Sequence, residues 1–136
     1  MTKIIDKTIK KAVRMACEVR KNSYSPYSDF AVGAAVITSD NSIFTAANVE
    51  NSSYGATVCA ERAAVFKAVS DGKKNLEAIV IAAEYKGKSV YPCGVCRQVL
   101  AEFNPSMKVY LVNSSSREIE KIVSLKSLYP DNFSMY

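Results

Sequence analysis

The chain has 136 residues, of which 49% are hydrophobic and 23% charged, with a formal net charge of +5, four cysteines and no histidine. This length and composition fit one folded domain, which we expect to span residues 1–136; no apolar run approaches the roughly 20 residues of a membrane span, and no secretion signal is visible. The absence of histidine excludes Ser-His-Asp triads, Cys-His proteases and every metal site that contains an imidazole.

The first predicted element is an amphipathic helix within residues 1–21, where the excess of positive charge is concentrated. The apolar residues that recur every four positions on one face are Ile5, Ile9, Val13 and Cys17. The basic residues that share another face are Lys3, Lys7, Lys10, Lys11, Arg14 and Lys21. We interpret this basic face as solvated and expect neither a membrane nor a nucleic-acid partner; binding of one of these by the helix is the alternative.

Two strands are predicted next, after a loop at residues 23–29 in which proline and small polar residues interrupt the helical period. The strands cover residues 30–38 and 43–48. Residues 39–42 connect them, and Asp40 and Asn41 in this connection tolerate positive φ. The two strands are therefore expected to pair antiparallel as a hairpin.

The remainder of the chain alternates helices and strands. A helix at residues 58–69 is followed by Gly72 as its C-terminal cap, a strand at 76–83, and a second helix at 92–103 that opens with Pro92. Strands at residues 107–112 and 117–123 and a short last helix complete the order. This order predicts an α/β fold, a three-layer α/β/α arrangement with a mixed, roughly five-stranded sheet covered by helices on both faces.

Three of the cysteines lie in two short motifs, Cys59-Ala60-Glu61 and Pro92-Cys93-Gly94-Val95-Cys96, each at a predicted helix start. Without a secretory signal we expect reduced thiols and a cytoplasmic protein. The dipole at a helix N-terminus lowers thiol pKa values, so three thiolates can converge on one zinc ion and leave a fourth position for water. Cys17 belongs to the apolar stripe of the first helix, and we leave it out of the site.

Glu61 is the candidate acid/base group, because it follows Cys59 by two residues and zinc chemistry on water requires a proton carrier beside the metal. A first-turn acid that only favours the helix dipole is the alternative interpretation. Cys-Ala-Glu together with Pro-Cys-x-x-Cys matches the zinc-deaminase signature, with cysteine in place of its histidine. The combination predicts a zinc-dependent hydrolytic deaminase.

Beyond these residues, the chain from about residue 25 to 133 resembles the small homotetrameric cytidine deaminases, which use three cysteines as zinc ligands. The motifs that carry the resemblance, in chain order, are Pro26-Tyr27-Ser28-Asp29-Phe30, Val32-Gly33-Ala34-Ala35, Asn48-Val49-Glu50-Asn51, Cys59-Ala60-Glu61-Arg62, Pro92-Cys93-Gly94-Val95-Cys96-Arg97-Gln98 and Leu128-Tyr129-Pro130-Asp131-Asn132-Phe133. The resemblance implies a cytidine-deaminase-like fold and hydrolysis of cytidine and deoxycytidine to uridine and deoxyuridine, with release of ammonia, in pyrimidine salvage.

The same resemblance implies roles for individual residues. Cys59, Cys93 and Cys96 hold one Zn²⁺ per subunit, and Glu61 carries protons to the ring nitrogen and then to the leaving amine. Arg62 hydrogen-bonds the thiolate sulfurs and draws off part of their charge. Neighbouring subunits of the homotetramer complete each site. The substrate contacts implied in this way are Phe30, Asn48, Glu50, Ala60 and Phe133.

Four positions depart from the usual family pattern. Asn41 follows Asp40 where the hairpin turn is typically Asp-Gly, and Ala47 stands where glycine often precedes the asparagine. Tyr91 replaces a common serine before Pro92, and Tyr129 replaces leucine. Because Tyr91 lies next to the second cysteine motif, substrate selectivity is the property these changes bear on most. The alternatives that the sequence leaves open are a blasticidin-S-type deaminase, a nucleic-acid-editing deaminase, a non-catalytic zinc-stabilised protein and a redox Cys-x-x-Cys module.

Overall fold

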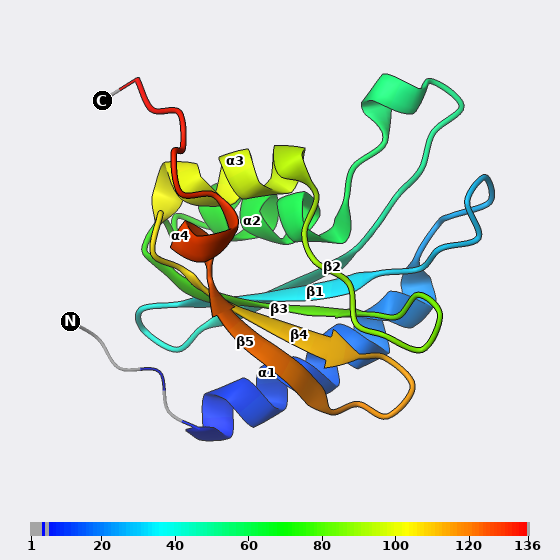
Figure 1. Ribbon diagram of the computed structural model, residues 1–136, viewed down its shortest axis with the longest axis horizontal. Coiled ribbons are helices and arrows are strands. Elements are labelled where there is room, and N and C mark those ends of the chain that lie inside the picture. The colour runs from blue at the N-terminus through cyan, green and yellow to red at the C-terminus, as the bar shows by residue number, and fades with distance from the viewer. Residues whose placement is uncertain (1–3, 5, 136) are drawn as a thin grey trace.

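The computed structural model describes residues 4 and 6–135, and its central element is a five-stranded mixed sheet in the order β2-β1-β3-β4-β5 (Figure 1). The strands are β1 (Gly33–Thr38), β2 (Ile43–Ala47), β3 (Leu76–Ala83), β4 (Lys108–Asn113) and β5 (Ile119–Ser124). The helices are α1 (Asp6–Val19), α2 (Ala60–Ser70), α3 (Gly94–Phe103) and α4 (Leu125–Leu128), with short 3₁₀ turns η1 (Arg20–Asn22) and η2 (Tyr54–Ala56). Only β3 and β4 pair parallel; the other neighbours are antiparallel. The predicted three-layer α/β/α fold is confirmed.

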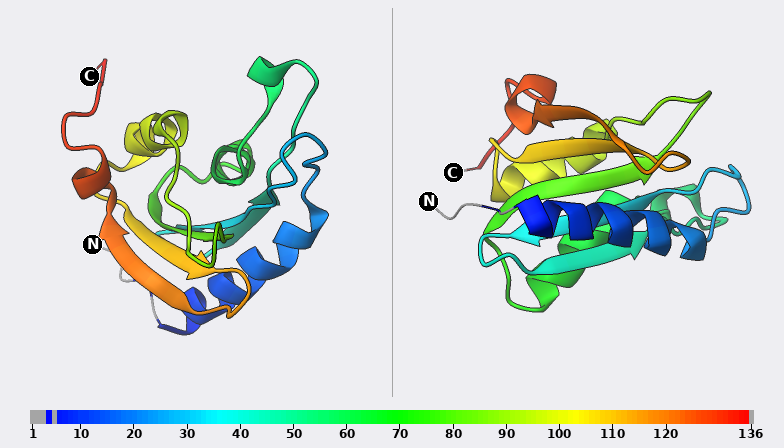
Figure 2. Two further views of the ribbon diagram at one scale, coloured as in Figure 1. Left: turned by 45° about the vertical axis from the view of Figure 1, so that its right-hand side comes forward. Right: turned by 90° about the horizontal axis from the view of Figure 1, so that it is seen from below.

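Each face of the sheet has its own apolar core, because side chains alternate between the faces along every strand. Helix α1 covers one face, while α2 and α3 cover the other (Figure 2). Along β3, Ala78 and Val80 pack under α1, whereas Ile79 and Ile81 pack under α2 and α3. A strand buried on both faces reads as a continuous apolar run, which is why the bounds predicted for β3 agree with the structure.

Helix α1 confirms the amphipathic pattern of the first segment. Val13 and Cys17 are buried against the sheet, so Cys17 is the apolar core thiol that we expected. Lys7, Lys10 and Arg14 are exposed on the opposite side. Lys3 and Ile5, which we placed on the same two faces, lie outside the described residues.

The hairpin of β1 and β2 forms with Gly33 opposite Ala47 and Ile37 opposite Ile43, and Asn41 in its turn has φ 65°. Strand β1 begins three residues later than predicted. Residues 30–32 bond instead to the side chain of Asn48, which accepts from the Val32 N–H and donates to the Phe30 carbonyl. Gly33 is required at the start of β1, because a Cβ there would lie 2.0 Å from the Ala16 carbonyl oxygen of α1.

The ends of the later elements also follow from local chemistry. Helix α2 ends before Gly72, whose φ of 85° and N–H bond to the Val69 carbonyl confirm the predicted cap. Strand β5 begins at Ile119 and not at residue 117, because Arg117 adopts φ 63° in the turn after β4. No helix in residues 6–135 is long and apolar enough to cross a membrane.

Candidate metal centre and active site

The three cysteines predicted to bind metal come together at the N-termini of α2 and α3. Cys59 is the N-cap residue of α2, Cys93 is the N-cap residue of α3, and Cys96 lies in the first turn of α3. Their sulfur atoms all lie within 4.8 Å of one another, and 3.8 Å separates the sulfurs of Cys59 and Cys93. Two neighbouring helix starts on one face of the sheet therefore create the cluster.

The sulfur positions fit a tetrahedral zinc ion. A Zn–S bond of about 2.3 Å and tetrahedral angles place neighbouring sulfurs about 3.8 Å apart. All three cysteines are free thiols, and soft thiolate ligands favour zinc over hard cations such as magnesium. Cys96 is buried while Cys93 is exposed, so the cluster has a closed side and an open side. Three ligands and an open side are the features of a catalytic zinc site.

Arg62 lies against the cysteine cluster, one turn into α2. Its Nη2 lies 3.5 Å from the Cys59 sulfur and 3.4 Å from the Thr57 carbonyl oxygen, and its Nε is buried without a hydrogen-bond partner among the described residues. A hydrogen bond from the Cys96 thiol and the contact with Arg62 lower the pKa of Cys59. The neighbouring Cys59 sulfur, together with burial, raises the pKa of Cys96. Arg62 thus stabilises negative charge on this cluster.

Glu61 is the buried carboxyl group of the site. It lies in the first turn of α2 and is only 6% exposed. Burial raises the pKa of Glu61 to about 7, and the negative charge of Cys59 acts in the same direction. A carboxyl group with such a pKa takes up and releases protons near neutral pH, as a general acid/base must. Ala60, between Cys59 and Glu61, is fully buried.

Asn48 and Glu50 hold the loop that precedes β1. The Asn48 side-chain oxygen accepts from the Val32 N–H at 2.9 Å and from the Ser23 hydroxyl, and its amide nitrogen donates to the Phe30 carbonyl at 2.8 Å. The Glu50 carboxylate accepts from the hydroxyl and N–H of Ser28 and from the Tyr27 N–H. The Ser28 hydroxyl bond is the main reason that the pKa of Glu50 is lowered. Both residues therefore order the loop that carries Phe30.

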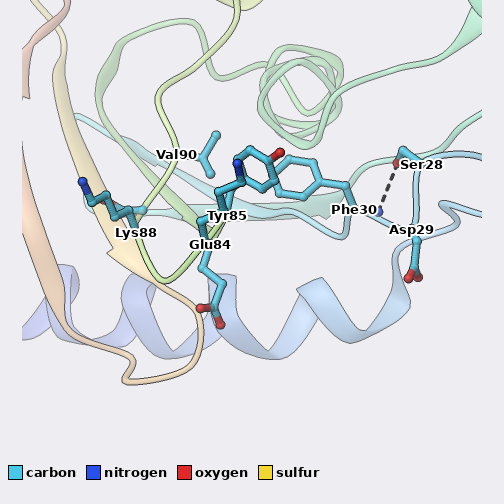
Figure 3. Close-up of a pocket in the computed structure, with 9 residues that line it drawn as sticks. Ser28, Asp29, Phe30, Glu84, Tyr85, Lys88 and Val90 are labelled. Carbon is cyan, nitrogen blue, oxygen red and sulfur yellow. Dashed lines mark hydrogen bonds between the residues drawn. The ribbon is translucent and has the colours of Figure 1, made fainter.

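A cavity of about 740 Å³ lies beside Phe30 (Figure 3). The ring of Phe30 meets the ring of Tyr85 edge to face, with 6.5 Å between centroids. The other residues that line this cavity are Ser28, Asp29, Glu84, Lys86, Lys88, Ser89 and Val90. Val90 and Phe30 also pack against the apolar core on the face of the sheet that α2 and α3 cover.

Our sequence reasoning missed Tyr85 and Val90 as cavity residues. Both lie in the connection between β3 and α3, directly after the carboxyl end of β3. In open α/β sheets, ligands bind outside the carboxyl ends of parallel strands. The parallel pair β3 and β4 was not identifiable from the sequence, so this signal becomes usable only with the strand order.

Phe133 lies on the C-terminal segment, where its backbone contacts Gln98 of α3 and Tyr129. The residue is 63% exposed, and its carbonyl oxygen accepts a hydrogen bond of 3.1 Å from the Gln98 side chain on α3. The segment that carries it leaves α4 and runs past α3 toward the C-terminus (Figure 1). The other predicted residues lie at the starts of α2 and α3 or in the loops beside them.

Comparisons with known proteins agree with this geometry. Residues 6–112 match the model of the family described as cytidine and deoxycytidylate deaminase zinc-binding region. A cytidine deaminase of Sporosarcina psychrophila is 46% identical over 127 residues, which are 93% of this chain and 91% of that protein. A cytidine deaminase of Halalkalibacterium halodurans is 46% identical over 122 residues, which are 89% of this chain and 90% of that protein.

Solved structures resemble this fold over nearly its whole length. The crystal structure of cytidine deaminase from Burkholderia pseudomallei superposes with a TM-score of 0.83 at 40% identity, over 90% of this chain and 97% of that chain. The cytidine deaminase from Mycobacterium tuberculosis superposes with a TM-score of 0.79 at 35% identity, over 96% of this chain and 99% of that chain.

Proposed function

The chain belongs to the cytidine and deoxycytidylate deaminase family and is a zinc-dependent hydrolytic deaminase, and we propose that its substrates are free cytidine and deoxycytidine. The products are then uridine or deoxyuridine and ammonia. The observation that carries this proposal is the gathering of three thiols at two helix N-termini, next to the buried carboxyl group of Glu61. We further propose that residues 1–136 form one catalytic domain and act in pyrimidine salvage in the cytoplasm.

Cys59, Cys93 and Cys96 hold the zinc ion in this proposal. When bound, zinc lowers the pKa of a coordinated water to about 7, so that this water can act as a nucleophile near neutral pH. The side chain of Glu61 accepts a proton from the attacking water and gives it to the ring nitrogen next to C4. It then accepts the proton of the hydroxyl group now on C4 and delivers it to the amino group, which leaves as ammonia as the C4 carbonyl forms. A carboxyl group whose pKa is about 7 is suited to both transfers, because it loses and regains a proton at little cost.

Arg62 offsets the charge of the ligand set. Three thiolates and a zinc dication carry a net negative charge, which weakens the metal as an electrophile. The guanidinium of Arg62 is already 3.5 Å from the Cys59 sulfur, and its buried Nε has a free N–H within the described part of the chain. Donation from Arg62 to the sulfurs withdraws charge from the metal.

The sugar contacts in this proposal use the bonding capacity that Asn48 and Glu50 retain. The Asn48 amide nitrogen carries two N–H groups and uses one on Phe30. A carboxylate has about four acceptor positions, and Glu50 uses three of them on residues 27 and 28. The remaining N–H of Asn48 and the remaining acceptor position of Glu50 can therefore bind the two hydroxyl groups of a ribose. The ring of Phe30 packs on the pyrimidine, and the buried Ala60 closes the pocket next to it.

We propose that the active unit is a homotetramer in which Phe133 of one subunit packs on the pyrimidine in a neighbouring subunit. The exposed side chains near the site support this assembly, because several large apolar groups stay uncovered in the single chain. Those around the site are Tyr24, Tyr27, Tyr54, Tyr85, Tyr91 and Val95, which are between 39% and 79% exposed.

The deciding experiment compares three substrates. Purified protein of known zinc content is incubated with cytidine, deoxycytidine and blasticidin S, and turnover is followed by ultraviolet absorbance and ammonia release. Turnover of the first two substrates that disappears in Glu61→Gln supports the proposal. Turnover of blasticidin S alone assigns the chain to the aminonucleoside-detoxifying type, and zinc without any turnover refutes catalysis on these substrates.

A further inference from the structure

Two consecutive residues of α3 tie the metal-binding turn to the C-terminal segment. They are Arg97 and Gln98, which directly follow the metal ligand Cys96. Neither belongs to the roles assigned above. Arg97 bonds to a residue 31 positions later and Gln98 to one 35 positions later, so sequence spacing alone does not indicate these contacts with the C-terminal segment.

Arg97 connects the turn before Cys93 to the end of α4 by two hydrogen bonds. Its Nε donates to the Pro92 carbonyl at 2.8 Å, and its Nη1 donates to the Leu128 carbonyl at 2.8 Å. Arg97 is partly buried, and charged hydrogen bonds to backbone carbonyls are strong in such a position. One planar guanidinium thus sets the distance between the backbone next to a metal ligand and the last helical turn.

Gln98 continues the connection along the segment after α4. Its side-chain oxygen accepts from the Tyr129 hydroxyl, and its side-chain nitrogen donates to the Phe133 carbonyl at 3.1 Å. The Phe133 N–H lies 3.5 Å from the same Tyr129 hydroxyl oxygen. The two side chains and the backbone of Phe133 form a closed ring of hydrogen bonds. Both ends of the Gln98 amide are used, which fixes its orientation.

These three hydrogen bonds hold the backbone of Phe133 in place but leave the residue largely exposed. Phe133 is 63% exposed as a residue, although both its N–H and its carbonyl have partners. A large apolar side chain held in the open on a fixed backbone is suited to insertion into a partner, because the segment has little freedom left to lose on binding.

We propose that Arg97, Gln98 and Tyr129 are positioning residues that present Phe133 to the active site of a second copy of this chain. This inference rests on the proposed function, in which a neighbouring Phe133 packs on the pyrimidine. Arg97 also connects the C-terminal segment that carries Phe133 to the turn before the metal ligand Cys93 of the same subunit. The Tyr129 hydroxyl is the group that joins the Gln98 side chain to the Phe133 backbone N–H.

The first test replaces Tyr129 by phenylalanine, which removes only the hydroxyl group. We expect KM for cytidine to rise about fivefold, with kcat and zinc content unchanged, because loss of one hydrogen bond loosens the donated segment without touching Glu61 or the cysteines. Hydrogen exchange of the peptide covering residues 129–135 is expected to accelerate. The control is Tyr110→Phe, a tyrosine buried on the α1 face of the sheet, which is expected to change neither KM nor this exchange.

The second test asks whether Gln98 and Tyr129 act through one link. Gln98→Met keeps the length of the side chain and removes both bonds, so it is expected to raise KM at least as much as Tyr129→Phe. The double variant is expected to match Gln98→Met alone, since the Tyr129 link is already gone. Effects that multiply in the double variant contradict the shared link.

The outcomes separate this inference from the proposed function. Absence of cytidine turnover in the wild-type protein refutes the proposed function. Faster exchange at residues 129–135 with an unchanged KM overturns the positioning role, and unchanged exchange in both variants overturns the hydrogen-bond ring itself. A loss of zinc or of kcat in Tyr129→Phe also contradicts the proposal, because it places the effect at the metal and not at the donated segment.

Discussion

At the residue scale, the site depends on burial, which raises the pKa of an acid, and on a cation placed next to the cysteine sulfurs. Glu61 is an acid whose burial raises its pKa to about 7, and Arg62 is a cation placed against a sulfur cluster. Both neighbours in sequence interact with the cysteine cluster, but Glu61 is buried, whereas Arg62 places its Nη2 3.5 Å from the Cys59 sulfur, and we propose a different function for each. Each function is testable by one substitution.

Glu61→Gln keeps the size of the side chain and removes its ability to carry protons. We expect kcat for cytidine to fall by about a thousandfold or more, which is within the range for loss of a general acid/base. Zinc content is expected to stay at one ion per chain, measured by elemental analysis. Retention of more than a tenth of the activity contradicts the assignment of Glu61.

Arg62→Ala removes the cation next to the thiolates. We expect zinc affinity to fall by roughly 10-fold to 100-fold, the usual effect of losing a partner that hydrogen-bonds a metal ligand. Competition with a chromogenic chelator measures this, and Arg14→Ala, at an exposed position on α1, is the control. Unchanged zinc affinity together with unchanged turnover excludes the role of Arg62.

At the scale of elements, close packing and turn chemistry hold the layers in place. Gly33 lets α1 approach the start of β1, and the turn of the hairpin is joined to the loop after α2 through Asp40 and Lys73, 2.7 Å apart. Neither contact touches the active site. Both therefore affect stability before they affect catalysis.

Gly33→Ala is expected to destabilise the fold by about 3 kcal/mol, because the new methyl group meets the backbone of α1 at Ala16 and no side chain there can move aside. Urea unfolding measures this change. Gly55→Ala is the matched control, since a Cβ at Gly55 has nothing within 4 Å, and its unfolding midpoint is expected to stay near that of the wild-type protein.

Asp40 makes stability depend on pH in the acid range. Hydrogen bonds from Lys73 and from the Thr38 hydroxyl lower the pKa of Asp40 in the folded state. Its contribution is therefore complete above the unfolded-state pKa of about 4 and is lost as the pH falls toward the lowered folded-state pKa. We expect Asp40→Asn to lower Tm at pH 7, and this Tm difference to shrink steadily as the pH falls below about 4. Glu102→Gln, an exposed substitution on α3, serves as the control, and a Tm difference that grows in acid refutes the argument.

At the scale of the whole molecule, the isolated chain has the metal cluster and the buried Glu61, whereas Phe133 is largely exposed on the C-terminal segment. In the site that we propose, Glu61 of one subunit and Phe133 of another act together, so that assembly becomes part of catalysis. Subunit mixing tests this directly, because the two contributions then come from different chains.

Phe133→Ala is expected to raise KM for cytidine about tenfold, as expected when a buried aromatic contact is lost. Mixing it with inactive Glu61→Gln, under conditions that exchange subunits, is expected to restore wild-type KM in the hybrid sites that join an intact Glu61 to an intact Phe133. The control is the same mixture without exchange, which is expected to keep the kinetics of Phe133→Ala. Equal kinetics before and after exchange contradict the shared site.

Much of the fold and the centre of the site were predictable from local sequence. The order of helices and strands followed from apolar periodicity, and the bounds of β3 agreed with the structure because a strand buried on both faces is a continuous apolar run. Cys59, Cys93 and Cys96 were identifiable because short motifs at helix starts carry the ligands. The predicted start of β1 was wrong because the Asn48 side chain, and not a neighbouring strand, bonds the backbone of Phe30 and Val32.

Sequence by itself therefore determined the types and order of the elements, the three thiols and the acid beside them, because these depend on residues a few positions apart. Only the tertiary structure decided the strand order, the loop-holding bonds of Asn48 and Glu50, the cavity next to Tyr85, and the attachment of Phe133 to Gln98. These features join segments tens of residues apart. Their contacts depend on how the layers pack, which no local pattern in the chain encodes.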